Sequence, residues 1–185
     1  MIEEFLADAK ERMKKSVDAT RNELATVRTG RASPHLLDRV QVDYYGAETP
    51  LQQLAQVAAT DARLLTVTPY DKSSISAIEK AVMESDLGLT PSNDGNVIRL
   101  QIPEMTEERR REMVKVVHGV AEEGRVAIRN VRRDIMSDLR DLKKEGDVGE
   151  DDERRAETAL QKQTDEAIAE IDGLLKGKEE EILEV

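Results

Sequence analysis

Two clusters of arginine stand out on a chain that is otherwise acidic. Residues 28–34 read RTGRASP and residues 128–134 read IRNVRRD, while the whole chain carries 28 Lys and Arg against 39 Asp and Glu, a net charge of −11. Residues 109–133 hold eight basic and three acidic side chains, whereas residues 141–185 hold seven basic and sixteen acidic ones. Guanidinium groups grip phosphates bidentately, so this segregation predicts a cationic face that binds a polyanion and an acidic face that limits indiscriminate adhesion.

The second cluster becomes a continuous stripe if residues 106–144 form one helix. Arg125, Arg129 and Arg133 follow one another at four-residue steps, where like charges destabilise a helix. Few acids stand four positions away, so a solvated face held by intrahelical ion pairs is the weaker interpretation. The stripe is instead predicted to contact phosphates along an RNA backbone. With Ile128 as origin and roughly 100° per residue, the arginines between about 40° and 140° are Arg125, Arg129, Arg132, Arg133 and Arg140.

The other reactive residue types form no catalytic or metal-binding pattern. The chain has no cysteine, and its two histidines, His35 and His118, are isolated in the sequence. The RTGR segment lacks the Gly-Lys-Ser/Thr of a nucleotide P-loop, and the acids of residues 147–153 lack the residue order of a calcium loop. We therefore expect no metal, no cofactor and no enzymatic activity.

Three long amphipathic helices are predicted to position the arginines. Apolar residues recur at three- and four-residue steps over residues 1–30, 106–144 and 151–183, with Gly146 and Gly149 in the turn between the last two. Each stripe is too long to bury itself, so the three helices should form an antiparallel bundle. The second helix alone would span roughly 55 Å at 1.5 Å per residue.

The middle of the chain has a different pattern. Alternating apolar residues at 40–44, 64–68 and 97–102 predict strands, and residues 73–86 predict a short helix. The sequence thus predicts an α+β protein: a three-helix bundle from residues 1–30 and 105–185, and a small inserted α/β domain from residues 31–104. Two short crossings predict an L-shaped molecule with a hinge. The expected hinge residues are Thr29, Gly30, Arg31, Glu104 and Met105.

No segment reads as a targeting signal or a membrane span. The first fifteen residues are amphipathic and mixed in charge, and no run of eighteen apolar residues occurs. A cytoplasmic protein with no membrane partner is expected, and we expect it to act as a monomer.

Several short motifs follow one another in a fixed order along the chain. They are residues 28–34 (RTGRASP), 43–46 (DYYG), 85–89 (SDLGL), 106–110 (TEERR), 128–134 (IRNVRRD) and 163–165 (QTD). Together they resemble the ribosome recycling factor family, and the resemblance runs from end to end of the chain. That family combines a three-helix bundle with a hinged α/β domain, as the residue patterns above also indicate.

The resemblance implies a translation factor that enters the ribosome after peptide release. With elongation factor G and GTP it would split the subunits and free messenger RNA and deacylated tRNA. The bundle would lie on the 23S-type rRNA of the large subunit, with Arg132 and Arg129 as principal contacts. The supporting contacts that we predict are Arg28, Arg31, Arg110, Arg125 and Arg133.

One alternative stays open on the residues alone. An acidic helical bundle could be an adaptor that binds other proteins and no RNA, because a low isoelectric point is unusual for an RNA-binding protein. The arginine stripe distinguishes the two, since only RNA binding should weaken steeply with salt.

Overall fold

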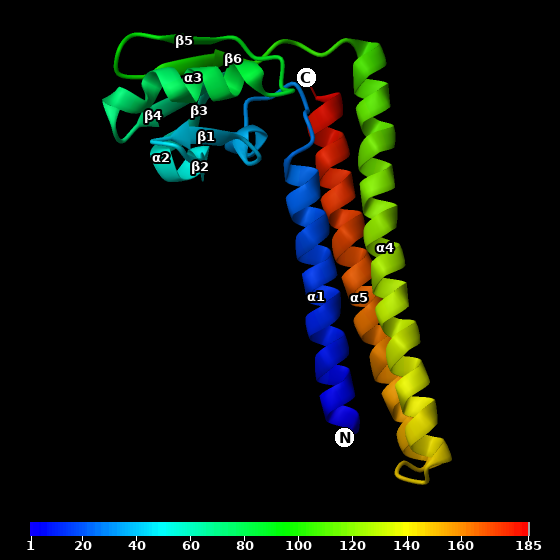
Figure 1. Cartoon of the computed structure of the whole chain (residues 1–185). Coiled ribbons are helices and arrows are strands. Elements are labelled where there is room, and N and C mark those ends of the chain that lie inside the picture. Colours follow the sequence, from blue (N-terminus) through cyan, green and yellow to red (C-terminus); the bar gives the residue numbers. More distant parts are fainter. Residues whose placement is uncertain (185) are drawn as a thin grey trace. The chain divides into compact units, whose positions relative to one another are not determined.

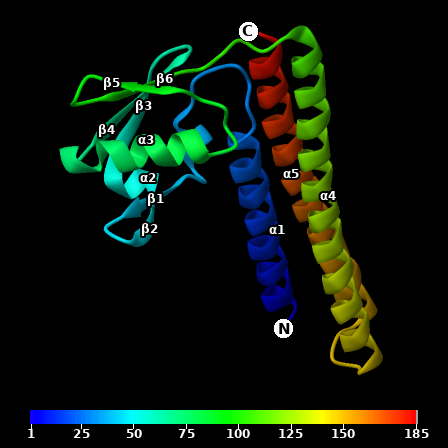
Figure 2. The ribbon, with the colours of Figure 1, turned by 45° about the horizontal axis from the view of Figure 1, so that its top comes forward.

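The computed structural model describes residues 1–184 and divides the chain into two compact units. Unit one comprises Met1–Leu24 and Val114–Glu180, and unit two comprises Ala25–Met113 together with the end of the chain from Glu181. The chain therefore passes between the units at residues 24–25, 113–114 and 180–181, whereas the sequence patterns placed the domain boundaries at residues 30–31 and 104–105. Figures 1 and 2 show the helices and strands of both units.

Unit one is a three-helix bundle, as predicted. Its helices are α1 (Ile2–Ala25), α4 (Glu107–Lys144) and α5 (Glu150–Leu183). The first turns of α4, up to Met113, and the end of α5 from Glu181 are grouped with unit two. In Figure 1, α4 runs antiparallel to both α1 and α5. Most residues of the predicted apolar stripes are buried, because each amphipathic helix can remove its apolar face from water only against the other two, although Val116 of α4 is 45% exposed. Fully buried members of the bundle core are Ala9, Met13, Val117, Ile128, Ile135, Leu139, Leu160 and Ile171.

The first helix is shorter than predicted. It ends at Ala25 rather than at residue 30. The residues that follow include Thr26, Val27 and Thr29, whose β-branched side chains favour a helix less, and Gly30, which has a φ of 84°. A left-handed residue cannot continue a right-handed helix, so the chain leaves the helical conformation before Gly30.

The turn between α4 and α5 is a Schellman motif. Gly146 has a φ of 80°, and its N–H donates to the Lys143 carbonyl at 3.1 Å. The next N–H, of Asp147, donates to the Leu142 carbonyl at 3.0 Å. These two bonds satisfy carbonyls that the end of α4 would otherwise leave unpaired, so α4 stops at Lys144 and the chain reverses into α5.

Unit two contains two antiparallel sheets and one longer helix. Strands β1 (Gln41–Tyr44) and β2 (Ala47–Pro50) form a hairpin, and the four-stranded sheet has the order β3-β4-β6-β5. Its strands are β3 (Ala55–Asp61), β4 (Leu64–Pro69), β5 (Pro91–Asn93) and β6 (Ile98–Gln101). Short helical turns are η1 (Pro34–Leu37), α2 (Leu51–Leu54) and η2 (Lys72–Ser74).

Helix α3 (Ile75–Glu84) lies against the four-stranded sheet (Figure 2). Its Ile78 and Val82 share one buried core with Val67, Ile98 and Leu100 of β4 and β6. The α+β class is thereby confirmed. Strands β2, β3 and β5 were not predicted, and the helix predicted over residues 73–86 begins as η2 and ends at Glu84.

Over residues 1–184, none of the helices combines the length and the apolar character needed to cross a membrane.

Candidate nucleic-acid interface

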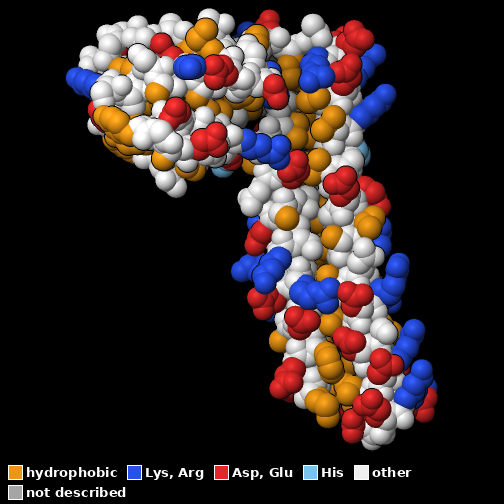
Figure 3. All heavy atoms as spheres, in the orientation of Figure 1, with side chains coloured by type: hydrophobic (Ala, Val, Ile, Leu, Met, Phe, Trp, Pro, Cys, Tyr) orange, Lys and Arg blue, Asp and Glu red, His pale blue; other side chains and the backbone are white. Residues whose placement is uncertain are grey.

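Helix α4 carries the predicted arginine stripe beside the bundle core. Ile128, Val131 and Ile135 are buried, at 0%, 6% and 1% exposure. The arginines between them point away from that core, and basic side chains recur along the side of the bundle that α4 forms (Figure 3). A rigid helix therefore fixes the spacing of Arg125, Arg129, Arg132 and Arg133. These four residues are called the arginine face below.

Two residues of the arginine face are neutralised within the bundle. Arg125 forms ion pairs with Asp172 of α5 at 2.7 Å and with Glu122 at 3.1 Å, and its side chain is only 18% exposed. The pKa of Arg125 is raised, chiefly by the hydrogen bond to Asp172. Arg129 pairs with the other oxygen of Glu122 at 3.2 Å. Intrahelical ion pairs, the interpretation given less weight from the sequence, therefore do form at Arg125 and Arg129.

The other two residues, Arg132 and Arg133, keep unpaired charges. Within residues 1–184, no carboxylate oxygen lies within 4.0 Å of either guanidinium group. The neighbouring Asp134 is taken by Arg12 of α1, at 2.8 Å, so it does not neutralise them. The Nε atom of Arg132 is buried without a hydrogen-bond partner. The guanidinium group of Arg132 therefore has an N–H donor that no acceptor within the described residues occupies.

The remaining predicted arginines, Arg28, Arg31 and Arg110, lie in unit two. None of the three has an ion pair within the described part of the chain, and the Nε of Arg110 is buried without a partner, like that of Arg132. Arg28 lines a cleft of about 370 Å³. The other residues around this cleft are Gly30, Ile102, Pro103, Glu104, Met105, Thr106 and Arg109.

The cleft gathers three of the expected hinge residues, Gly30, Glu104 and Met105. Gly30 has a φ of 84°, a conformation that favours glycine. Thr29 is buried, and its hydroxyl accepts a bond of 3.4 Å from the N–H of Arg31. Glu104 pairs with Arg63. Both predicted crossings therefore lie at one place within unit two, while their role as a hinge stays a prediction.

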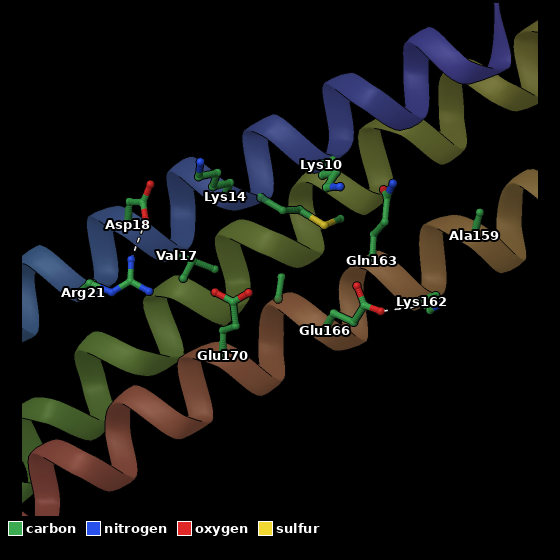
Figure 4. Close-up of a pocket in the computed structure, with 12 residues that line it drawn as sticks. Lys10, Lys14, Val17, Asp18, Arg21, Ala159, Lys162, Gln163, Glu166 and Glu170 are labelled. Atoms are coloured by element: carbon green, nitrogen blue, oxygen red, sulfur yellow. Dashed lines mark hydrogen bonds and ion pairs between the residues drawn. The ribbon is translucent and has the colours of Figure 1, made fainter.

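A groove of about 510 Å³ lies between α1 and α5 (Figure 4). Its floor contains the apolar Met13, Val17 and Ala167, while one wall carries Lys10 and Lys14 of α1, and the other wall carries acidic residues of α5. Mixed charges of this kind do not make a surface for a polyanion, so the arginine face remains the better candidate. Among residues 1–184, no group of three or more His, Cys, Asp or Glu side chains could hold a metal ion.

Comparison with known proteins identifies the family. A family model described as ribosome recycling factor matches residues 20–183. The ribosome-recycling factors of Bacillus subtilis and Shouchella clausii are 55% and 56% identical over 185 residues, which is 100% of each chain.

The chain belongs to the ribosome recycling factor family. A solution structure of a ribosome recycling factor has 41% sequence identity and a TM-score of 0.80, and the match covers 100% of this chain and 98% of that one. A second neighbour, a Thermus thermophilus ribosome recycling factor, has 49% identity and a TM-score of 0.72 over 99% of each chain. It belongs to a set of models with Escherichia coli elongation factor G bound to the post-termination complex. Members of the family are translation factors and not enzymes, which confirms that expectation.

The acidic partners that pair with Arg125 and Arg129, and so distinguish them from Arg132 and Arg133, were not predicted from the sequence. Glu122 stands three and seven residues before Arg125 and Arg129, a spacing that falls on one helix face, so periodicity could have found it. Asp172 and Asp134 could not have been assigned in this way. Their partners, Arg125 and Arg12, lie on other helices, and only the register of the bundle brings them together.

Proposed function

We propose that this chain disassembles the post-termination ribosomal complex together with elongation factor G and GTP. In this proposal it splits the ribosomal subunits and frees messenger RNA and deacylated tRNA for a new round of initiation. Family membership supports ribosome recycling as the process. A relative with 49% identity, considered on the post-termination complex with elongation factor G, supports these two partners. We further propose that the protein acts in the cytoplasm as a monomer.

Unpaired Arg132 and Arg133 on the rigid α4 carry the proposal for rRNA binding. An arginine that ion pairs within the protein must give up a carboxylate before it binds a phosphate, whereas these two offer their charges directly. The Nε of Arg132 has no hydrogen-bond partner within the described residues, so no bond inside the protein has to be broken there before a phosphate binds. We therefore rank Arg132 first, Arg133 second, and Arg129 third as contacts to the large-subunit RNA. Arg28, Arg31 and Arg110 are proposed as supporting contacts.

The proposed movement is mechanical. Anchored by its bundle, the protein would turn about Thr29–Arg31 and Glu104–Met105 when elongation factor G pushes on the inserted domain. The energy would come from GTP hydrolysis on that partner, since this chain has no nucleotide-binding motif.

Binding to large ribosomal subunits over a range of salt concentrations tests the anchoring step. Arg132→Ala should weaken binding by about 10- to 100-fold, because a hydrogen bond to a charged group contributes about 1.5–3 kcal/mol. It should also lower the slope of log affinity against log salt by about one. Arg155→Ala is the matched control, since Arg155 is 80% exposed on α5. Equal affinities of the two variants and the wild type would contradict rRNA binding by this face.

Distances between the two units test the hinge. The chain has no cysteine, so one engineered cysteine in each unit gives a cleanly labelled pair for single-molecule energy transfer. We expect a broad or multiple distance distribution on the ribosome that shifts when elongation factor G and GTP are added. A single distance that stays unchanged throughout splitting would remove the hinge from the mechanism.

A further inference from the structure

One carboxylate holds two guanidinium groups at the arginine face. Glu122 accepts from Nη1 of Arg125 through Oε2 at 3.1 Å and from Nη1 of Arg129 through Oε1 at 3.2 Å. Both oxygens of this single side chain are therefore occupied by different arginines. The hydrogen bond from Arg125, followed by that from Arg129, keeps the pKa of Glu122 below its ordinary value. Glu122 is thus the acceptor that a phosphate would have to replace.

The two arginines that Glu122 contacts differ in their other contacts. Arg125 is also bound by Asp172 at 2.7 Å and is 18% exposed, so it joins α4 to α5 whether or not Glu122 is present. Arg129 has no second carboxylate within residues 1–184, and it is 51% exposed. If Glu122 were displaced, Arg125 would remain neutralised, whereas Arg129 would become a free cation. Loss of Glu122 would therefore change the charge available for binding mainly at Arg129.

The arrangement of these residues supports a role in selectivity. The pair between Glu122 and Arg129 is solvent-exposed, with side chains 54% and 51% exposed, and exposed pairs of this kind are weak. A phosphate group competes for the same guanidinium nitrogens as a carboxylate and can bind an arginine bidentately, whereas Glu122 contacts Arg129 through Nη1 alone. A ligand that already contacts Arg132 or Arg133 could therefore displace Glu122 from Arg129. An anion that does not contact them gains less binding energy, so it compensates less well for breaking the Glu122–Arg129 pair.

We propose that Glu122 is a specificity-determining residue, an internal counter-anion that occupies the phosphate site of Arg129 in the free protein. This inference rests on the proposed binding of rRNA phosphates by the arginine face. Glu122 lowers the affinity for every polyanion, and it lowers most the affinity for those that do not also engage the unpaired arginines. Among Arg129, Arg132 and Arg133, the free protein consequently presents two open phosphate sites and one masked site rather than three open ones.

Replacing Glu122 by glutamine tests the proposal. Glu122→Gln keeps the length of the side chain but leaves only a neutral acceptor for Arg129, and charge-assisted bonds are roughly twice as strong as neutral ones. We expect affinity for large ribosomal subunits to rise about two- to fivefold, in line with the small energies of exposed pairs. Affinity for a non-specific polyanion, heparin, should rise by at least as much, so that the ratio of the two affinities does not increase.

The matched control is the next residue. Glu123→Gln removes the same charge from the same turn of α4, but within the described residues the Glu123 carboxylate forms no ion pair. It reports the effect of net charge alone and should raise affinity less than Glu122→Gln. When Arg129 is also replaced by alanine, Glu122→Gln should raise the affinity for large subunits no more than Glu123→Gln does. The guanidinium group that Glu122 masks is then absent. Far-ultraviolet circular dichroism should show that each variant keeps its helical content.

The outcomes separate this inference from the proposed function. Equal effects of Glu122→Gln and Glu123→Gln, or a gain that persists in Arg129→Ala, would overturn the masking role while leaving rRNA binding intact. A loss of affinity in Glu122→Gln would also overturn it, since Glu122 would then position Arg129 instead of masking it. If Arg132→Ala in the same titration binds like the wild type, the arginine face itself is not the binding surface and the proposed function fails first.

Discussion

At the scale of single residues, the contacts of an arginine determine whether its charge is available to bind a phosphate. Arg125 and Arg132 are of one type and lie on one helix, yet Arg125 holds two carboxylates while Arg132 holds none within residues 1–184. Both arginines lie on the long helix that the apolar periodicity predicts. The sequence alone could not separate them, because Asp172 reaches Arg125 only once α5 has packed on α4. Predicting the role of an arginine therefore needs the register of the bundle as well as the helical period.

The carboxylate of Asp94 in unit two also has its properties set by its contacts, and these contacts make the stability of the fold depend on pH. Asp94 accepts bonds from the N–H groups of Asn96 and Val97, each at 2.9 Å, and from Arg99 at 3.0 Å. These bonds, the one from Asn96 first, lower the pKa of Asp94 to about 2. A lowered pKa means that the charged form stabilises the folded state above the ordinary pKa of aspartate, and that this contribution is lost as the pH falls towards about 2.

We therefore expect Asp94→Asn to flatten the loss of stability between about pH 4 and pH 2. Chemical denaturation at a series of pH values measures this dependence. Asp86→Asn is the control, since within the described residues the Asp86 carboxylate forms no hydrogen bond or ion pair. If Asp94→Asn and the control lose stability with pH as steeply as the wild type, the bonds to Asp94 do not supply the dependence.

At the scale of elements, the long helices could be predicted and several strands could not. Apolar periodicity over 24 to 38 residues is a strong signal, and the three helices follow it. Strand β3, with the sequence AQVAATD, has weak alternation, and it is defined by its pairing with β4. Strand β5 has only three residues, and its register is fixed by β6. Strands β3 and β5 were therefore not predicted, because they are defined by pairing with other strands and not by a pattern within their own residues.

The bundle also depends on a small residue that periodicity does not single out. Gly124 of α4 lies where the three helices approach closely. A Cβ atom added there would be 2.8 Å from Cδ1 of Ile171 and closer still to the Thr20 hydroxyl. Thr20 is itself buried, and its hydroxyl donates to the Ser16 carbonyl at 2.9 Å. Helix α4 can therefore contact α1 and α5 at this level only because residue 124 has no side chain.

Gly124→Ala should destabilise the protein by about 1–3 kcal/mol, the typical cost of overpacking a core. Gly119→Ala provides a control on the same helix, because a Cβ atom there would meet nothing within 4 Å. That variant should instead stabilise by about 0.5–1 kcal/mol through the higher helix propensity of alanine. Thermal and denaturant unfolding measure both changes. Similar effects of the two substitutions would contradict the claim that glycine is needed at position 124 for close helix packing.

At the scale of the whole molecule, we propose separate tasks for the two units. Unit one supplies the arginine face with the unpaired Arg132 and Arg133, and unit two contains the cleft at which both predicted crossings meet. Both tasks would serve subunit splitting, in which one part of the protein holds the large subunit while the other part transmits a push from elongation factor G. The whole chain has a net charge of −11, and we expect this negative charge to limit binding to other polyanions.

Subunit splitting followed by light scattering tests the central claim most directly. Post-termination ribosomes are mixed with elongation factor G, GTP and either the wild type, Arg132→Ala or the Arg155→Ala control. We predict rapid loss of scattering with the wild type and the control, and a loss at least tenfold slower with Arg132→Ala at subsaturating protein and unchanged helical content. Splitting by Arg132→Ala at the wild-type rate would contradict the claim that the arginine face of α4 anchors the protein during recycling.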